Sequence, residues 1–259
     1  MGVGWKEGRK VRSEFERWGV KTVSYNLRKN RAVGEIGELA NQHEVDILCL
    51  QEADSIALPS HLGHMRLVHA TENNRLGLAM YVREDRFAVR AAHTFRLKKS
   101  LHDRVLAPAH ERLLGARLHD RETGRDIVAA SFHAAPLTAL NSLRRHQIHA
   151  ALAELRVLGP GLPALMVGDY NYPVFQNKLD RNMREAGYDL TLSDKRTYTR
   201  YKMFRGHFDF ATSSGMSIES VRTLDRGTSD HLPILVHALL DAETQQQLID
   251  RGAVDLSAA

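Results

Sequence analysis

The chain has 259 residues, of which 43% are hydrophobic and 26% are charged, a balance typical of globular proteins. A chain of this length can bury a large core without disulfides, and its single cysteine, Cys49, cannot form an internal one. The net charge of +5 favours polyanionic partners such as nucleic acid or phospholipid surfaces, although mild basicity can also serve solubility alone.

The sequence carries no sign of a membrane protein. The first 20 residues are rich in Lys and Arg and lack the apolar stretch of a signal peptide. No window approaches the roughly 20 apolar residues that cross a bilayer. We therefore expect a cytoplasmic monomer without a membrane span.

The first half of the chain is predicted to form mostly strands. A charged lead-in over residues 1–20 is followed by an alternating, β-rich segment at Lys21–Tyr25 and by a short helical pattern over residues 34–43. The continuous apolar run Val45–Leu50 indicates a strand buried on both faces. Further strands are predicted over residues 66–69, 78–82, 87–93, 111–118 and 126–132.

The second half contains the clearest predicted helix, over residues 138–157, which Gly159-Pro160-Gly161 ends. Its apolar side chains fall on one stripe: Leu140, Leu143, Ile148, Ala151, Leu152 and Leu155. A buried strand over 164–167, a helix over 178–186, strands over 207–211, 217–224 and 233–239, and a short helix within 241–259 follow. Many strands interleave with few helices, which does not fit the strict alternation of a Rossmann fold. The pattern predicts one α/β (α+β) domain over residues 21–240, with two packed sheets and helices outside them.

Five polar strings lie at the ends of predicted strands. Side chains at neighbouring strand ends can converge on one pocket without disturbing the core. Carboxylate and amide oxygens suit Mg²⁺ or Mn²⁺ rather than zinc, and imidazoles can donate to a phosphate or move a proton near neutral pH. The oxygen donors are Asn26, Glu52, Asp169, Asn171 and Asp230, and the histidines are His133 and His231.

Six strings in this order resemble the exonuclease–endonuclease–phosphatase superfamily. They are VSYN ending at Asn26, DILCLQEAD with Glu52, ASFHAAP with His133, MVGDYNYP, HFDFATSS with Asp209, and TSDHLPILV. The resemblance extends over Lys21–Leu240, nearly the whole chain. It implies a four-layer α/β/β/α sandwich of two mainly antiparallel sheets. The superfamily includes abasic-site endonucleases, pancreatic-type DNases, bacterial sphingomyelinases, inositol-polyphosphate 5-phosphatases and deadenylases.

The resemblance also implies roles for single residues. Glu52, with Asn26 and Asp230, would bind Mg²⁺, for which Mn²⁺ could substitute. Asp169 would orient or deprotonate the attacking water, and Asn171 would contact the phosphate. His231, supported by Asp209, and His133 would face the phosphate. Each residue also has an ordinary interpretation as a strand-end or surface group.

Two details of these motifs have alternatives. Asp169 and Asn171 are two residues apart, so on an extended segment they face the same way, although Gly, Asp and Asn also favour turns. Pancreatic-type DNases pair the histidine that His133 resembles with a glutamate on an earlier strand. Glu72 is the nearest candidate for that glutamate and is poorly placed.

The substrate is predicted from basic and aromatic residues near the motifs. Arg200, Tyr201, Lys202, Met203, Phe204 and Arg205 interleave cations, which can hold phosphates, with aromatic rings, which can stack on bases. Two further basic stretches comprise Arg28, Lys29 and Arg31, and Arg96–Lys99 with Arg104. A solvated charged face explains each of these stretches equally well.

We therefore predict a magnesium-dependent nuclease that hydrolyses phosphodiester bonds of DNA or RNA by in-line attack of water. The first alternative is a small-molecule or lipid-headgroup phosphatase or phosphodiesterase of the same superfamily. The Cys-Asp-Arg signature of the inositol 5-phosphatases is absent, which weighs against that substrate. The second alternative is an inactive scaffold that binds nucleic acid, but none of the expected Glu, Asp and His residues is lost.

Overall fold

The computed structural model describes residues 19–72, 74, 76–100, 110–172, 176–199 and 206–241. The predicted lead-in up to residue 18, the predicted terminal helix, Arg104, and the basic and aromatic segment of residues 200–205 lie outside this range. Within it, no helix is both long enough and apolar enough to cross a membrane.

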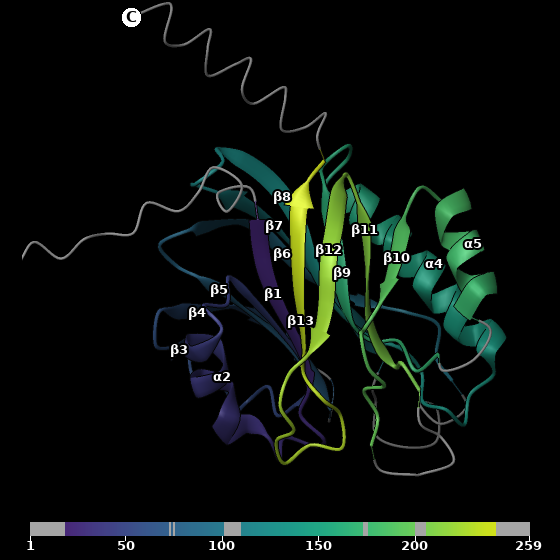
Figure 1. Ribbon diagram of the computed structural model, residues 1–259, viewed down its shortest axis with the longest axis horizontal. Coiled ribbons are helices and arrows are strands. Elements are labelled where there is room, and N and C mark those ends of the chain that lie inside the picture. Colours follow the sequence, from purple (N-terminus) through teal and green to yellow (C-terminus); the bar gives the residue numbers. More distant parts are fainter. Residues whose placement is uncertain are drawn as a thin grey trace, which may run out of the picture.

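Two sheets form the centre of the molecule (Figure 1). The seven-stranded sheet has the order β12 (Met216–Thr223), β13 (Ile234–Leu240), β1 (Gly19–Asn26), β2 (Ile47–Ala53), β5 (Gly77–Arg83), β4 (Met65–Ala70) and β3 (His61–Leu62). The six-stranded sheet has the order β10 (Asp189–Leu192), β11 (Asp209–Ser214), β9 (Ala164–Asp169), β8 (Arg125–His133), β7 (Glu111–Asp120) and β6 (Phe87–Arg96). Neighbouring strands are antiparallel except for two parallel pairs, β1 with β2 and β8 with β9.

Helices cover the outer faces of both sheets, as Figure 1 shows. The short 3₁₀ helix η1 (Val33–Glu35) and α2 (Ile36–Gln42) pack on the seven-stranded sheet, and α4 (Asn141–Leu158) and α5 (Gln176–Glu185) pack on the six-stranded sheet. A third apolar cluster, including Ile47, Val82, Leu114 and Val236, fills the space between the sheets. The predicted four-layer sandwich is confirmed.

The structure corrects the sequence prediction at several element ends. The first strand begins at Gly19, inside the predicted lead-in. The long helix begins at Asn141 rather than at residue 138, because Leu140 has an extended backbone with ψ 146°. Leu140 is therefore outside the helix and 76% exposed, although it was predicted to lie on the buried stripe. The short strands β3 and β10 were not predicted.

The two parallel pairs bring the polar strand ends to one edge of the sandwich. Asn26 at the end of β1 is level with Gln51 in β2, and His133 at the end of β8 is level with Asp169 at the end of β9. Gln51 Nε2 donates to Ser131 Oγ at 3.0 Å, which joins the two sheets directly beneath these ends. The fold therefore gathers the candidate residues from both sheets in one place.

Candidate functional site

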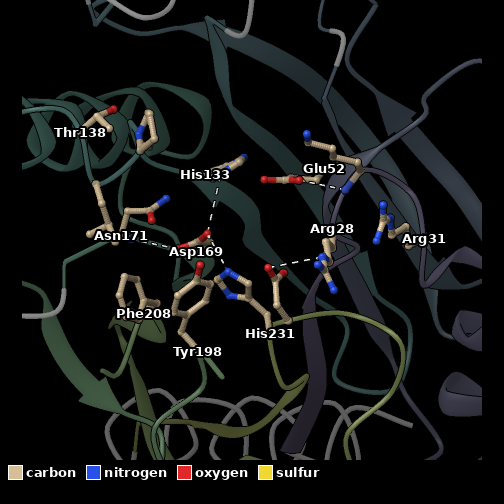
Figure 2. A pocket seen from close by; sticks show the side chains of 14 residues that line it. Arg28, Arg31, Glu52, His133, Thr138, Asp169, Asn171, Tyr198, Phe208 and His231 are labelled. Atoms are coloured by element: carbon tan, nitrogen blue, oxygen red, sulfur yellow. Dashed lines mark hydrogen bonds and ion pairs between the residues drawn. The ribbon is translucent and has the colours of Figure 1, made fainter. Parts of the chain in front are cut away.

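A cavity of about 390 Å³ lies at this edge of the sandwich (Figure 2). Its walls come from the ends of strands in both sheets and from the loops that follow them. Most of its lining side chains are charged or polar, as a site for an anionic substrate requires. The lining residues are Arg28, Lys29, Arg31, Glu52, His133, Pro136, Leu137, Thr138, Asp169, Asn171, Tyr198, Phe208, Asp230 and His231.

A β-bulge near the end of β2 turns Glu52 toward the cavity. The register with β5 shifts between Gln51 and Ala53, and Glu52 itself has a positive φ of 53°. Its Oε2 accepts a hydrogen bond from the backbone N–H of Lys29 at 2.8 Å. Figure 2 shows the carboxylate pointing toward the middle of the cavity, so the bulge serves to aim this side chain.

Asp169 and Asn171 form a turn, which is the second of the two conformations that the sequence left open. The backbone N–H of Asn171 donates to Asp169 Oδ1 at 2.9 Å, and Asn171 has a left-handed φ of 48°. This is the local Asx bond that makes Asp favourable in turns. Both side chains nevertheless line the cavity.

Gly168 is required directly before Asp169 because β8 passes very close to it. A Cβ at Gly168 would lie 1.9 Å from the carbonyl oxygen of Phe132, well inside van der Waals contact. Only glycine therefore lets β9 approach β8 closely enough to place Asp169 beside His133.

Asp169 Oδ2 lies at the centre of the site. It accepts a hydrogen bond from Asn26 Nδ2 at 3.1 Å and lies 3.7 Å from both His133 Nε2 and His231 Nε2. Burial raises the pKa of this carboxyl to about 7, against the lowering effect of His231 and with smaller raising effects from Asp209 and Glu52. The carboxyl can therefore exchange a proton near neutral pH.

His231 is held by Asp209 on its far side. Its Nδ1 lies 2.8 Å from Asp209 Oδ2, and its backbone N–H donates to Ser229 Oγ. Burial lowers the pKa of His231, but the charges of Asp209 and Asp169 outweigh burial and raise this pKa to about 10. The imidazole is therefore a cation at neutral pH, with Nε2 on the side of Asp169.

Asp230 and Arg28 line the cavity as well, and Asn26 links Arg28 to Asp169. Asn26 Oδ1 accepts a hydrogen bond from the backbone N–H of Arg28 at 3.0 Å. Arg28 Nε lies 3.4 Å from Asp230 Oδ2, so a positive charge already lies beside this carboxylate. Figure 2 shows Arg28 and Arg31 on the same side of the cavity as Glu52.

The donor atoms fit a hard divalent cation on the side of Glu52. Glu52 and Asp230 line the cavity with carboxylate oxygens, and Asn26 Oδ1, which accepts from Arg28 N, adds an amide oxygen, a donor set that suits Mg²⁺ or Mn²⁺. A second group of possible ligands consists of Asp169, Asp209 and His231, whose ligand atoms all lie within 4.8 Å of one another. The raised pKa of His231 keeps its imidazole protonated at neutral pH, and a protonated nitrogen cannot bind a cation, so this group is the poorer metal site.

The structure thus brings together the predicted residues Asn26, Arg28, Glu52, His133, Asp169, Asn171, Asp209, Asp230 and His231. Glu72 is exposed and does not line the cavity. Arg200, Tyr201, Lys202 and Arg205 lie outside the described residues.

Several wall residues were not predicted as part of the site. Pro136, Leu137 and Thr138 lie in the loop before α4, and the predicted helix, which began at residue 138, wrongly included the last of them. Tyr198 reaches the wall through an isolated β-bridge to His231, and its ring packs edge-on against the imidazole, with centroids 5.0 Å apart. A proline three residues after His133 was the available signal for the loop.

Comparison with known proteins agrees with this fold. A sequence model described as the Endonuclease/Exonuclease/phosphatase family matches residues 23–231. Similar structures include a Bacteroides thetaiotaomicron mannosyl-6-phosphatase (TM-score 0.66, 17% identity, 85% of this chain and 100% of that chain covered). The catalytic domain of human Nocturnin with bound sulfate is also similar (TM-score 0.66, 18% identity, 86% of this chain and 95% of that chain covered).

A third similar structure is D. rerio TDP2 in complex with a single-strand DNA product (TM-score 0.67, 13% identity, 85% of this chain and 98% of that chain covered). No curated protein matched the chain in a sequence search. At these identities the structural similarity establishes the fold alone.

Proposed function

Because the chain belongs to the endonuclease/exonuclease/phosphatase family, whose members hydrolyse phosphoester bonds, we propose that it is a divalent-metal-dependent nuclease. The observation that carries the proposal is the position of Asp169. Its carboxyl lies between two imidazoles and an amide, opposite the oxygen donors on the side of Glu52. This arrangement would supply a proton acceptor, hydrogen-bond donors and a metal site around one small volume.

Glu52 and Asp230, with Asn26, would hold Mg²⁺ or Mn²⁺ at the wall of the cavity. The ion would contribute positive charge against a non-bridging phosphate oxygen and so make the phosphorus more electrophilic. Glu52 is preoriented for this task because the bulge and the bond from Lys29 N fix its carboxylate. The nearby Arg28 guanidinium limits the repulsion between the carboxylates of Asp230 and Glu52.

Asp169 would orient the attacking water and take its proton. The two hydrogen bonds from Asn26 Nδ2 and Asn171 N fix the plane of the carboxyl. A pKa near 7 places this group where a general base is most effective at neutral pH. The side chain of Asn171, which lines the same cavity, would contact the phosphate.

His231 would donate a charged hydrogen bond to a phosphate oxygen, where negative charge grows during the reaction. Asp209 acts through this imidazole, since its bond to Nδ1 fixes the tautomer and favours the cation. His133, 3.7 Å from Asp169 at Nε2, would supply a second donor to the phosphate or to the leaving oxygen. The residues thus provide for in-line attack by water.

A nucleic-acid strand is the substrate that the walls support best. Three basic side chains, Arg28, Lys29 and Arg31, lie on one side of the cavity, and the rings of Tyr198 and Phe208 line it as well. Cations suit a phosphate backbone and aromatic rings suit bases or sugars. The similar TDP2 structure holds a single-strand DNA product, which adds to this proposal.

The test is a panel of substrates assayed with Mg²⁺, with Mn²⁺ and with EDTA. The panel contains single- and double-stranded DNA, RNA, mannose 6-phosphate, inositol phosphates and sphingomyelin. We expect EDTA-sensitive cleavage of an oligonucleotide. Fast hydrolysis of a sugar monophosphate, with none of DNA or RNA, would replace the nuclease by the phosphatase alternative.

Glu52→Gln provides the matching test of the metal site. It keeps the size of the side chain but removes the charge, so activity should fall by about 10²-fold or more, in line with the loss of one essential electrostatic contact. Asp189→Asn, which neutralises an exposed carboxylate on β10, is the control and should retain full activity. Equal activity of Glu52→Gln and the wild type would contradict the assignment.

A further inference from the structure

The loop that follows β1 has an unusual backbone. Arg28, Lys29 and Asn30 have φ angles of 48°, 55° and 65°, which places three consecutive non-glycine residues in the left-handed region. Side chains rarely adopt this conformation singly, and a run of three is strained at every step. Such strain persists only where the surroundings enforce it, and it concentrates at functional sites.

The candidate site itself enforces this conformation. The backbone N–H of Arg28 donates to Asn26 Oδ1 at 3.0 Å, that of Lys29 to Glu52 Oε2 at 2.8 Å, and that of Asn30 to Glu52 O at 2.8 Å. Three successive donors are therefore satisfied by two residues of the site. The strained loop and the bulge at Glu52 are one structural unit.

A second set of contacts fixes the far end of the loop. Thr228 Oγ1 donates to the carbonyl oxygen of Arg31 at 3.3 Å, and Thr228 N donates to Glu35 Oε1 at 2.7 Å. The segment of Thr228 leads directly to Asp230 and His231. The loop is thus fastened on both sides to elements that carry the proposed machinery.

The result of this rigid loop is a set of cations at the cavity wall. Arg28, Lys29 and Arg31 all line the cavity, and Arg28 is paired with Asp230. Lys29 and Arg31 are exposed, and neither has an ion pair with a described acidic side chain. Two uncompensated positive charges therefore border the site, on a backbone that Asn26 and Glu52 hold in its left-handed conformation.

We propose that Lys29 and Arg31 form a subsite for a second phosphate of the substrate, beside the phosphate that is hydrolysed. The inference rests on the proposed function and makes its substrate more specific. Flexible cations on a fixed backbone suit a phosphate next to the reacting one. The ligand chemistry is a second phosphate group, supplied either by the adjoining nucleotide of a strand or by a small molecule with two phosphates.

The experiment compares substrates that differ only in the second phosphate. The nucleotide arm uses TpT, pTpT and TpTp, and the small-molecule arm uses fructose 6-phosphate and fructose 1,6-bisphosphate, all with the metal-loaded full chain. We expect kcat/KM to rise by about tenfold or more with the second phosphate, mainly through KM, as one charge-assisted contact allows. The arm in which kcat/KM rises identifies whether a nucleotide or a small molecule supplies the second phosphate.

Variants assign the preference to the loop. In Lys29→Gln with Arg31→Gln, the ratio of kcat/KM with and without the second phosphate should fall to nearly one. The exchange Lys29→Arg with Arg31→Lys keeps both charges at the same backbone positions and should retain the ratio. Lys178→Gln with Arg181→Gln, on the exposed face of α5, removes two cations elsewhere and should also retain it.

Equilibrium binding gives a readout independent of turnover. With an uncleavable methylphosphonate analogue of pTpT, the slope of log K against log salt should be shallower by about one in the double Gln variant, because fewer counterions are released. If the wild type hydrolyses phosphoesters without preferring a second phosphate, the inference fails and the proposed function stands. If it hydrolyses none of them, both fail. A preference that survives in the double Gln variant also overturns the inference.

Discussion

Replacing Asp209 by Asn tests whether this carboxylate controls the charge of His231. The change preserves the shape of the side chain, and the backbone N–H groups of Phe208 and Asp209 can still donate to Thr197 Oγ1. It removes the negative charge that lies 2.8 Å from His231 Nδ1. We expect a folded protein in which His231 has lost the largest influence that raises its pKa.

The magnitude follows from burial. Asp209 is 1% exposed and His231 is 6% exposed, so water screens their attraction little. Breaking one side of such a pair costs about 3–5 kcal/mol, and about 1.4 kcal/mol corresponds to one pKa unit. The pKa of His231, raised to about 10 in the intact pair, should therefore fall by about 2–4 units. With the tautomer no longer fixed, kcat should fall by about 10²–10⁴-fold.

The sign of the pH dependence is also set by the raised pKa. Interactions of the imidazolium stabilise the protein fully below the unfolded pKa of about 6.5 and are lost as pH rises through about 10. In Asp209→Asn this loss, and the alkaline decline of activity, should occur at lower pH.

The assay is an NMR titration of the His231 ring in the metal-free protein, assigned with a His231→Gln variant, together with kcat/KM against pH. An imidazole that still titrates above pH 9 in Asp209→Asn, with activity within threefold of the wild type, would refute the reasoning.

Three further substitutions test other parts of the structure. Asp169→Asn should abolish activity. Because the pKa of Asp169 is raised to about 7, the metal-free wild type should lose stability as the pH rises from about 4 to 7, by up to about 4 kcal/mol relative to this variant. Urea unfolding of both proteins at pH 5 and pH 8 would show this loss. Equal changes in the two proteins would contradict the prediction. Arg86→Met should cost about 3–5 kcal/mol in urea unfolding while the folded protein keeps its kcat, since it leaves Asp120 buried without its arginine and leaves Asp46 with Arg83 as its remaining partner; a loss below about 1 kcal/mol would show that Arg86 does not stabilise the fold. Gly168→Ala should destabilise by more than about 2 kcal/mol, because its Cβ would meet the backbone of Phe132, and a melting temperature equal to the wild type would exclude that clash.

The sequence predicted the layers because their pattern is local. The apolar run at Val45–Leu50 became β2, and the buried face of α4 includes Ile148, Ala151 and Leu155, as the helical stripe indicated. Strand ends were predicted less well, since backbone geometry there depends on neighbouring strands. Leu140 fits the helical period, yet the loop after His133 determines its conformation.

The site was predicted in its residues but not in its geometry. The motifs named Glu52, Asp169 and Asn171, and their composition allowed the turn at Asn171, yet no pattern showed that Glu52 lies in a bulge. The bulge depends on bonds between segments distant in sequence, such as that from Lys29 N to the Glu52 carboxylate, whereas the turn is closed by the local bond from Asn171 N to Asp169 Oδ1. The periodicity of the sequence likewise could not predict the position of Tyr198, because a single β-bridge to His231 determines it.

Buried polar residues beneath the loop after His133 show the same limit. Arg144 and Gln147 occupy the buried face of α4, where an apolar stripe was expected to continue. Arg144 Nη1 donates to the carbonyl oxygen of Pro136 at 2.7 Å, and Gln147 Oε1 accepts from the backbone N–H of Ala135 at 2.8 Å. These side chains satisfy the backbone of a loop that carries three cavity-lining residues. Their helical positions were visible in the sequence, but the groups they bind were not.

Buried charged residues at the two edges of the sandwich have different surroundings, and this difference separates a structural cluster from the candidate functional one. At the far edge, Arg86 is fully buried and bonds to both Asp46 and Asp120, so its charge is matched within the protein. At the cavity edge, burial raises the pKa of Asp169 and lowers that of Arg144. Stability alone would favour the first arrangement, because unmatched buried charge is costly. Asp169 is instead surrounded by His133, His231 and Asn26, and its carboxyl can change its charge near neutral pH, which is the property that the proposed general base requires.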